Sequence, residues 1–431
     1  MKNSGNNFRL RTPAFYNKRG ITWNRISSRA VSFRLKTEQV NFGENSPCMF
    51  LPEENILMTI GMLNSKVAKC FLEYINSTMT FQVLDIQSIP YLPVKDDDIE
   101  RIVNECIGLA KNEWDDYETS WDFITHPFIK FNTVGDLSKT FAKWESYAQQ
   151  RFDKVKENEE SINRYFIKSY NLSDEISLDV AEDDITIRLS NMEADVKSFL
   201  SYAVGCMFGR YSLDKDGTVY AGNEWKESVY KTYIPDDDNV IPITDEEYIE
   251  NDIVARFISW LKVVFGEEKL EDNLIFIANA LGKKGVASRE IIRNYFVNDF
   301  FKDHCQTYNV TSVGKRPIYW LFDSGKQNGF KALIYMHRYN ADTIGNLRVD
   351  YLHRMERIYE SEINRMQDTI DNSSNAREVT AATKRKEKLQ KQLKECQEYD
   401  EKIGHLALSR IEIDLDDGVK VNYEKVQTAN D

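Results

Sequence analysis

Cationic and aromatic side chains alternate through the first 36 residues of the chain, a pattern typical of a surface that binds nucleic acid. The segment holds nine lysines and arginines and no acidic residue. Such cations neutralise phosphates, arginine can bind guanine through two hydrogen bonds, and an aromatic ring can pack on a sugar or on a displaced base. A solvated basic face, or one that packs against an acidic partner, would have the same composition. We expect DNA contacts from these residues and one later lysine: Arg9, Arg11, Lys18, Arg19, Trp23, Arg25, Arg29, Arg34 and Lys66.

The tryptophan in this set has a second interpretation. If the Trp23 ring belongs to the hydrophobic core, its replacement would destabilise the fold and would not change sequence preference. A melting curve would separate the two roles.

One glycine-lysine pair, Gly325-Lys326, could suggest a phosphate-binding loop, but its surroundings do not fit. Such a loop needs a glycine five residues before its second glycine and serine or threonine after the lysine. Trp320 and Gln327 occupy these two positions. The sequence therefore excludes a nucleotide-binding loop of this type here.

Two further catalytic patterns are weak. Pro235-Asp236 with Glu267-Glu268-Lys269 matches a loose nuclease pattern, but chance matches are expected in a chain with 69 acidic and 56 basic residues. The five histidines have neither metal-ligand spacing nor a nucleophile motif beside them. We expect His337 and His353 to make hydrogen bonds in the core or at an interface.

Composition indicates a folded protein of two to four domains, at roughly 100 to 200 residues per domain. Hydrophobic residues make up 42% and aromatic residues 12% of the 431 positions. No apolar run approaches the roughly 18 residues that cross a bilayer, and the first residues do not resemble a signal peptide. The six cysteines are scattered without a Cys-x-x-Cys pair, which argues against a disulfide framework or a zinc site. We expect a cytoplasmic protein without a metal site.

The elements that position these residues indicate an α+β fold that is predominantly helical. Apolar residues at spacings of three and four predict one amphipathic helix over 56–74. Three aspartates at 96–98 predict the start of another, because carboxylates there accept from free backbone N–H groups. The remaining expected elements are strands at 20–23 and 30–35, an extended segment at 81–83, a helix over 137–170, a strand-like run at 185–189, an apolar helix near 199–208, an acidic loop over 214–250, three helices within 245–308, strands at 318–322 and 332–336, and an antiparallel helical hairpin that turns at 372–375.

Several blocks carry a resemblance that covers nearly the whole chain. They are residues 57–94, Trp121-Asp122-Phe123, 202–214, 316–322 and 335–340. Together they resemble the C-terminal, target-recognition and helical part of the PglX adenine-specific DNA methyltransferases, which belong to BREX phage-defence systems. The resemblance implies that residues 57–94 are a framework for DNA-reading loops. Within this block Asn64 could cap a helix or bond locally, and Gln82 and Asp85 could fix a turn. We favour this structural role for Asp85 and a surface position for Lys66.

The resemblance also implies that catalysis lies elsewhere. These methyltransferases hold the target amino group with an [Asn/Asp/Ser]-Pro-Pro-[Tyr/Phe] tetrapeptide, whereas no two of the nine prolines here are adjacent. A glycine-rich turn for S-adenosylmethionine is also missing near the N-terminus. We therefore expect no catalytic or cofactor-binding residue in this chain, with S-adenosylmethionine held by a separate or upstream catalytic half.

The implied partners are double-stranded DNA, the catalytic half and other BREX proteins. A non-enzymatic interaction module of the defence complex and an inactive fragment of a split gene are open alternatives. The expected domains are a target-recognition-like domain over 1–95, a helical domain over 96–235, an α+β domain over 236–350, the hairpin over 351–412, to which we assign a role in assembly, and a tail over 413–431.

Overall fold

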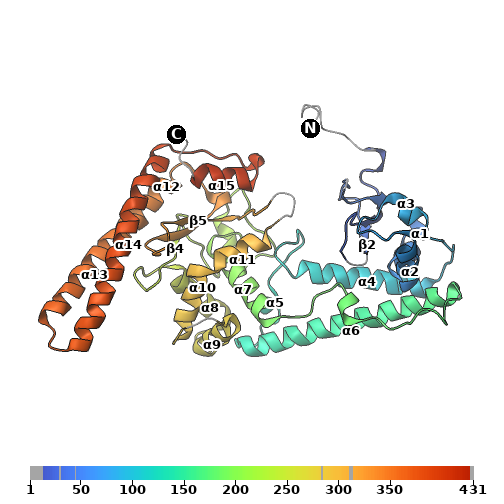
Figure 1. The fold of residues 1–431 in the computed structure, drawn as a ribbon, viewed down its shortest axis with the longest axis horizontal. Coiled ribbons are helices and arrows are strands. Elements are labelled where there is room, and N and C mark those ends of the chain that lie inside the picture. Colours follow the sequence, from blue (N-terminus) through green and yellow to red (C-terminus); the bar gives the residue numbers. More distant parts are fainter. Residues whose placement is uncertain (1–12, 29–30, 44, 283–284, 310–313, 428–431) are drawn as a thin grey trace. The chain divides into compact units, whose positions relative to one another are not determined.

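The computed structural model describes residues 13–28, 31–43, 45–282, 285–309 and 314–427. The chain forms two compact units: unit 1 is Met1–Trp114 with Ser146–Leu189, and unit 2 is Asp115–Glu145 with Ser190–Asp431. The fold is α+β and predominantly helical, as expected, with two small antiparallel sheets (Figure 1). None of the described helices combines the length and the hydropathy needed to cross a membrane. The finer division into five domains stays a prediction.

Unit 1 packs helices against a three-stranded sheet of order β2-β1-β3. Strand β1 pairs with β2 from Gly20 opposite Lys36 to Trp23 opposite Phe33, which confirms the two expected strands. The elements are β1 (Gly20–Trp23), β2 (Phe33–Lys36), β3 (Cys48–Met49), α1 (Glu53–Asn64), α2 (Lys66–Ile75), α3 (Val83–Gln87), α4 (Asp97–Asp115) and part of α6 (Leu137–Ser169), with single 3-10 turns at Pro13–Phe15 and Glu182–Asp184.

The prediction of a single helix over 56–74 was wrong, because the helix is interrupted at Ser65 and divides into α1 and α2. Ser65 has an extended backbone, with φ −72° and ψ 159°. Its hydroxyl donates to the Met62 carbonyl at 2.6 Å and accepts from the Ala68 N–H at 3.4 Å. A serine in this position satisfies an N–H that a helix start leaves unpaired. After the break Val67 of the expected apolar stripe is still fully buried, but Tyr74 at the far end of the stripe is 87% exposed.

Two segments expected to be extended or strand-like differ in the structure. Val83 begins α3, because the Asp85 carboxylate accepts from the Gln82 N–H at 2.7 Å and closes the first turn. The same carboxylate accepts from Asn76 Nδ2 at 2.8 Å, which confirms the expected structural role of Asp85. Residues 185–189 form no regular element, and the two isoleucines of this run are buried in a small apolar cluster.

Unit 2 is built around α7 and a second antiparallel sheet of order β4-β6-β5. Strand β5 pairs with β6 from Tyr319 opposite Tyr335 to Asp323 opposite Lys331. Four described helices lie within 245–308, where we expected three. The elements are α5 (Pro127–Lys130), α7 (Met192–Met207), β4 (Ile241–Pro242), α8 (Ile253–Phe265), α9 (Leu270–Leu281), α10 (Ser288–Asn298), α11 (Phe300–Thr307), β5 (Tyr319–Asp323), β6 (Lys331–Tyr335), α12 (Thr343–Asn346), α13 (His353–Asn372), α14 (Ala376–Leu408) and α15 (Val419–Gln427), with short 3-10 or π turns at Glu227–Val229, Met336–Arg338, Leu347–Leu352 and Leu415–Asp417.

Helices α13 and α14 form the expected hairpin and lie side by side in Figure 1, with the turn at 373–375. The Glu395 carboxylate of α14 fixes the hairpin to the β5–β6 turn. It accepts from Ser324 Oγ at 2.9 Å, from the Gln327 N–H at 2.8 Å and from the Gly329 N–H at 3.0 Å. The base of the hairpin is thus an integral part of unit 2.

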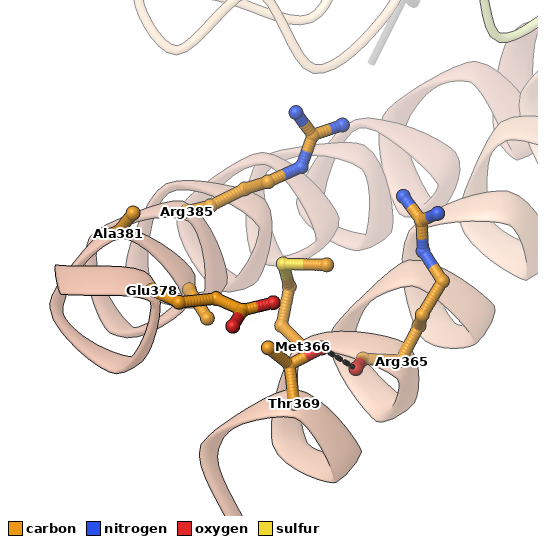
Figure 2. A pocket seen from close by; sticks show the side chains of 7 residues that line it. Arg365, Met366, Thr369, Glu378, Ala381 and Arg385 are labelled. Atoms are coloured by element: carbon orange, nitrogen blue, oxygen red, sulfur yellow. Dashed lines mark hydrogen bonds between the residues drawn. The ribbon is translucent and has the colours of Figure 1, made fainter. Parts of the chain in front are cut away.

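Nearer the turn, side chains of both hairpin helices line an open hollow of about 320 Å³ (Figure 2). Arg385 in this hollow is ion-paired with Glu246 at 2.7 Å and with Glu362 at 3.5 Å, so its charge is already balanced. Thr369 Oγ1 donates to the Arg365 carbonyl at 3.0 Å. These contacts are those of a helix pair and give no sign of a ligand site.

Candidate nucleic-acid interface

The predicted DNA contacts that the structure describes all lie in unit 1, but they differ in exposure. Arg9, Arg11 and Arg29 lie outside the described residues. In the described set, the exposed residues are Lys18 and Arg34, the half-buried ones are Arg19, Arg25 and Lys66, and Trp23 is buried.

Trp23 belongs to the core of unit 1. Its side chain is 2% exposed, and its indole N–H donates to the Phe81 carbonyl at 3.2 Å. The ring centroid lies 5.9 Å from that of Phe33 on the neighbouring strand. A ring held in this way cannot pack on a nucleotide unless its surroundings open. The burial favours the structural role of Trp23 over a base contact.

Arg19 lies in an acidic groove and forms an ion pair with Glu53. Phosphates would meet like charges in this groove, and Arg19 is already paired there. The arrangement therefore favours a structural role for Arg19. The groove has a volume of about 800 Å³ and is lined by four carboxylates, two guanidinium groups and two uncharged side chains: Glu53, Glu54, Asp97, Glu100, Arg19, Arg101, Leu57 and Asn104.

Lys66 and Arg34 also have partners within unit 1. Lys66 Nζ donates to the Asp179 carbonyl. Burial raises the pKa of Glu159 to about 7, and the charge of nearby Arg34 opposes this rise. Glu159 therefore gains its negative charge near neutral pH, where it balances part of the charge of Arg34.

Lys18 and Arg25 are ion-paired with no acidic group among the described residues. Lys18 Nζ lies 5.2 Å from the centroid of the Phe15 ring, and the Lys18 carbonyl accepts from Lys36 Nζ at 2.8 Å. The Arg25 carbonyl accepts from the Phe81 N–H at 2.7 Å, which fixes this residue beside the end of β1. These two cations are the best placed to contact phosphates. Lys36 is also one of the nine cations of the first 36 residues, but it is only 3% exposed and holds the Lys18 carbonyl.

The residue blocks of unit 2 that carried the resemblance form internal scaffold contacts. Arg210 Nε donates to the Tyr211 hydroxyl at 2.9 Å. The Asn239 amide donates to the Tyr335 carbonyl and its oxygen accepts from the Tyr335 N–H, both at 3.1 Å. Asn239 was not singled out from the sequence, although its positive φ of 67° is of the kind that asparagine tolerates. These contacts stabilise the fold of unit 2.

Among the residues that the structure describes, only Asp236–Asp238 bring three possible metal ligands together. Asp236 is ion-paired with Arg256, and Asp238 accepts from the Tyr351 hydroxyl at 2.6 Å. Glu267, the other acidic part of the loose nuclease pattern, pairs with Lys262 at 2.8 Å. The Asp236 and Glu267 carboxylates of this pattern thus have structural partners.

The histidines that the sequence singled out behave as structural groups. His353 Nε2 lies 2.9 Å from Asp400 Oδ1, which confirms the expected hydrogen bond. The His337 ring packs 5.0 Å from that of Tyr335, and its Nδ1 has no hydrogen-bond partner among the described residues. Burial lowers the pKa of His337 to about 4, so this imidazole is neutral near pH 7.

Comparison with known proteins shows which proteins this chain is similar to. No protein-family model matches the chain. It is 38% identical over 418 residues to the adenine-specific methyltransferase PglX of Lacticaseibacillus casei (strain Zhang), which covers 95% of this chain and 34% of that protein. It is 32% identical over 455 residues to the adenine-specific methyltransferase BrxX of Escherichia coli O9:H4 (strain HS), which covers 98% of this chain and 37% of that protein. The chain is homologous to these methyltransferases. It spans about a third of the length of the curated relatives it matches.

Proposed function

We propose that this chain is the DNA-recognition and scaffold part of an adenine-specific (N6) DNA methyltransferase of a BREX phage-defence system. It would correspond to the C-terminal part of the relatives and would act with a catalytic part that lies outside the matched third. The observation that carries this proposal is the homology over nearly the whole chain. The sequence of the chain lacks the paired-proline motif with which such enzymes hold the target amino group.

The described residues do not fit S-adenosylmethionine, and we assign no step of methyl transfer to them. Both described sheets are short and antiparallel, and no described strand runs through a glycine-rich turn into a helix. The cofactor and the pocket for the target adenine would belong to the catalytic part.

The contribution of this chain would be to hold the duplex. Chemistry on a base requires that the base leave the helical stack, so the duplex must be fixed while one adenine enters the catalytic pocket. Phosphate contacts set the register and orientation of a protein on DNA. Lys18 and Arg25 would supply such contacts from the sheet of unit 1, whose segments are fixed by the buried Lys36 and by pairing with Phe81.

Salt dependence of duplex binding tests this assignment. Each phosphate contact contributes about −0.9 to the slope of log affinity against log salt, so the double variant Lys18→Ala/Arg25→Ala should flatten the slope by about 1.8. Fluorescence anisotropy of a labelled duplex measures it. The matched control is Lys384→Ala/Lys391→Ala, which removes two exposed cations from α14. Equal changes in both variants would show that DNA responds only to overall charge and would overturn the assignment.

A second candidate is a protein-interaction module without DNA contact. It is favoured by the net charge of −13 and by the internal partners of Arg19 and Lys66. In that case the chain would assemble with defence proteins, and duplex binding would be undetectable at physiological salt.

A further inference from the structure

Large apolar side chains are exposed on one uncharged segment of unit 1. Residues 76–84 contain no charged side chain. Within this segment Met79 is 62% exposed and Leu84 is 73% exposed, and Ile26 on the adjoining segment is 63% exposed. We call residues 76–84 together with Ile26 the 76–84 surface. Single exposed apolar residues are ordinary, but several on adjoining segments mark a surface that a partner covers.

This surface is held in a fixed shape before any partner binds. Ile26 forms an antiparallel bridge with Thr80, and the Ser27 N–H donates to the Met79 carbonyl at 3.0 Å. Asn76 Nδ2 donates to the Thr80 carbonyl at 2.7 Å and also reaches the carboxylate that closes the first turn of α3. A segment that is already ordered loses little conformational entropy when it binds, which favours association.

We infer that the 76–84 surface is the docking site of the catalytic part of the methyltransferase. The inference rests on the function proposed above. Two observations select this occupant. The relatives are about three times as long as the segment they share with this chain, so a large body of protein is available to cover an apolar surface. The surface itself carries no charged side chain, so it offers no cation to phosphates and suits a protein partner better.

The double variant Met79→Glu/Leu84→Glu tests the inference. Two carboxylates placed in an apolar contact would have to be desolvated without partners, so affinity for the catalytic part should fall at least about a hundredfold. Binding is measured by co-purification and by titration of the purified chain with the remaining methyltransferase segment. The control is Val40→Glu/Leu189→Glu, which adds the same charge at two exposed apolar residues elsewhere in unit 1. All four positions are exposed, so each variant should keep its melting temperature.

A measurement without substitutions supports the test: hydrogen exchange of residues 76–87 should slow when the catalytic part is bound. If the wild-type chain does not assemble with the catalytic part at all, both the proposed function and the inference are wrong. Normal assembly by Met79→Glu/Leu84→Glu, or unchanged exchange in 76–87, would overturn the docking site alone. Loss of duplex binding with assembly intact would assign the surface to DNA, and loss of a self-association of the free chain would assign it to a second copy. Either result would also overturn the inference.

Discussion

Replacement of Trp23 by alanine distinguishes a core residue from a DNA contact, and the structure sets the size of the effect. A buried tryptophan removes about 200 Å² from water, which at about 25 cal/mol per Å² corresponds to about 5 kcal/mol. The smaller burial free energy of the alanine side chain must be subtracted from this value. Core Trp→Ala changes typically destabilise by about 3–5 kcal/mol. The lost indole hydrogen bond to the Phe81 carbonyl accounts for about 1 kcal/mol of this cost. We expect unit 1 to lose about 3–5 kcal/mol.

Native-state hydrogen exchange of peptides from β1 and β2 measures this loss within unit 1, which avoids treating a chain of two units as one transition. Trp121→Ala is the matched control, because Trp121 is fully exposed and its removal should change stability by less than about 0.5 kcal/mol. Unchanged exchange of β1 in Trp23→Ala, together with lost sequence preference in DNA binding, would refute the core assignment.

The effects of three further substitutions on stability follow from the contacts or the burial of single side chains. Burial raises the pKa of Glu159 from its ordinary value to about 7, so the contribution of this group to stability is full below the unfolded pKa and is lost as pH rises through about 7. Glu159→Gln should therefore raise the melting temperature of unit 1 at about pH 8 and leave it nearly unchanged at about pH 4. Equal shifts of the melting temperature at both pH values would contradict the burial of this carboxyl group. Glu395→Ala removes the acceptor of three hydrogen bonds from the β5–β6 turn and should cost roughly 2–4 kcal/mol, seen as faster exchange in 324–329, whereas Glu398→Ala on the exposed side of α14 should have no effect there. Ser65→Ala removes the cap of α2 and should cost about 1 kcal/mol, seen as faster hydrogen exchange in α2, while Ser65→Thr, which can still donate to Met62 and accept from Ala68, should retain more of that stability.

Periodic patterns in the sequence predicted the long elements well. The helical hairpin, the strands β5 and β6 and helix α6 all follow from local spacing and turn residues, and the structure has each of them. The Asp96 carboxylate accepts from the Asp98 and Ile99 N–H groups at 3.0 and 3.1 Å, so the expected helix start is also confirmed. Such features depend on neighbours within a few residues.

Contacts between distant residues could not be predicted in this way. Asn64 ends α1 because its side chain pairs with both the N–H and the carbonyl of Phe33, at 2.9 Å each, on a strand 31 positions earlier. The apolar spacing continues through the break that follows, so periodicity alone indicates one helix. The partners of two predicted DNA contacts could not be predicted for the same reason, because Glu53 and Asp179 lie far away in the sequence from Arg19 and Lys66.

The most direct test of the central claim is site-specific methylation by the reassembled enzyme. The remaining methyltransferase segment is combined with S-adenosylmethionine and duplex DNA, with and without this chain, and N6-methyladenine is mapped by sequencing. The account predicts methylation at one defined sequence when both parts are present, none from this chain alone, and none at that sequence from the other part alone. Methylation by this chain alone, or an identical methylation pattern in its absence, would contradict it.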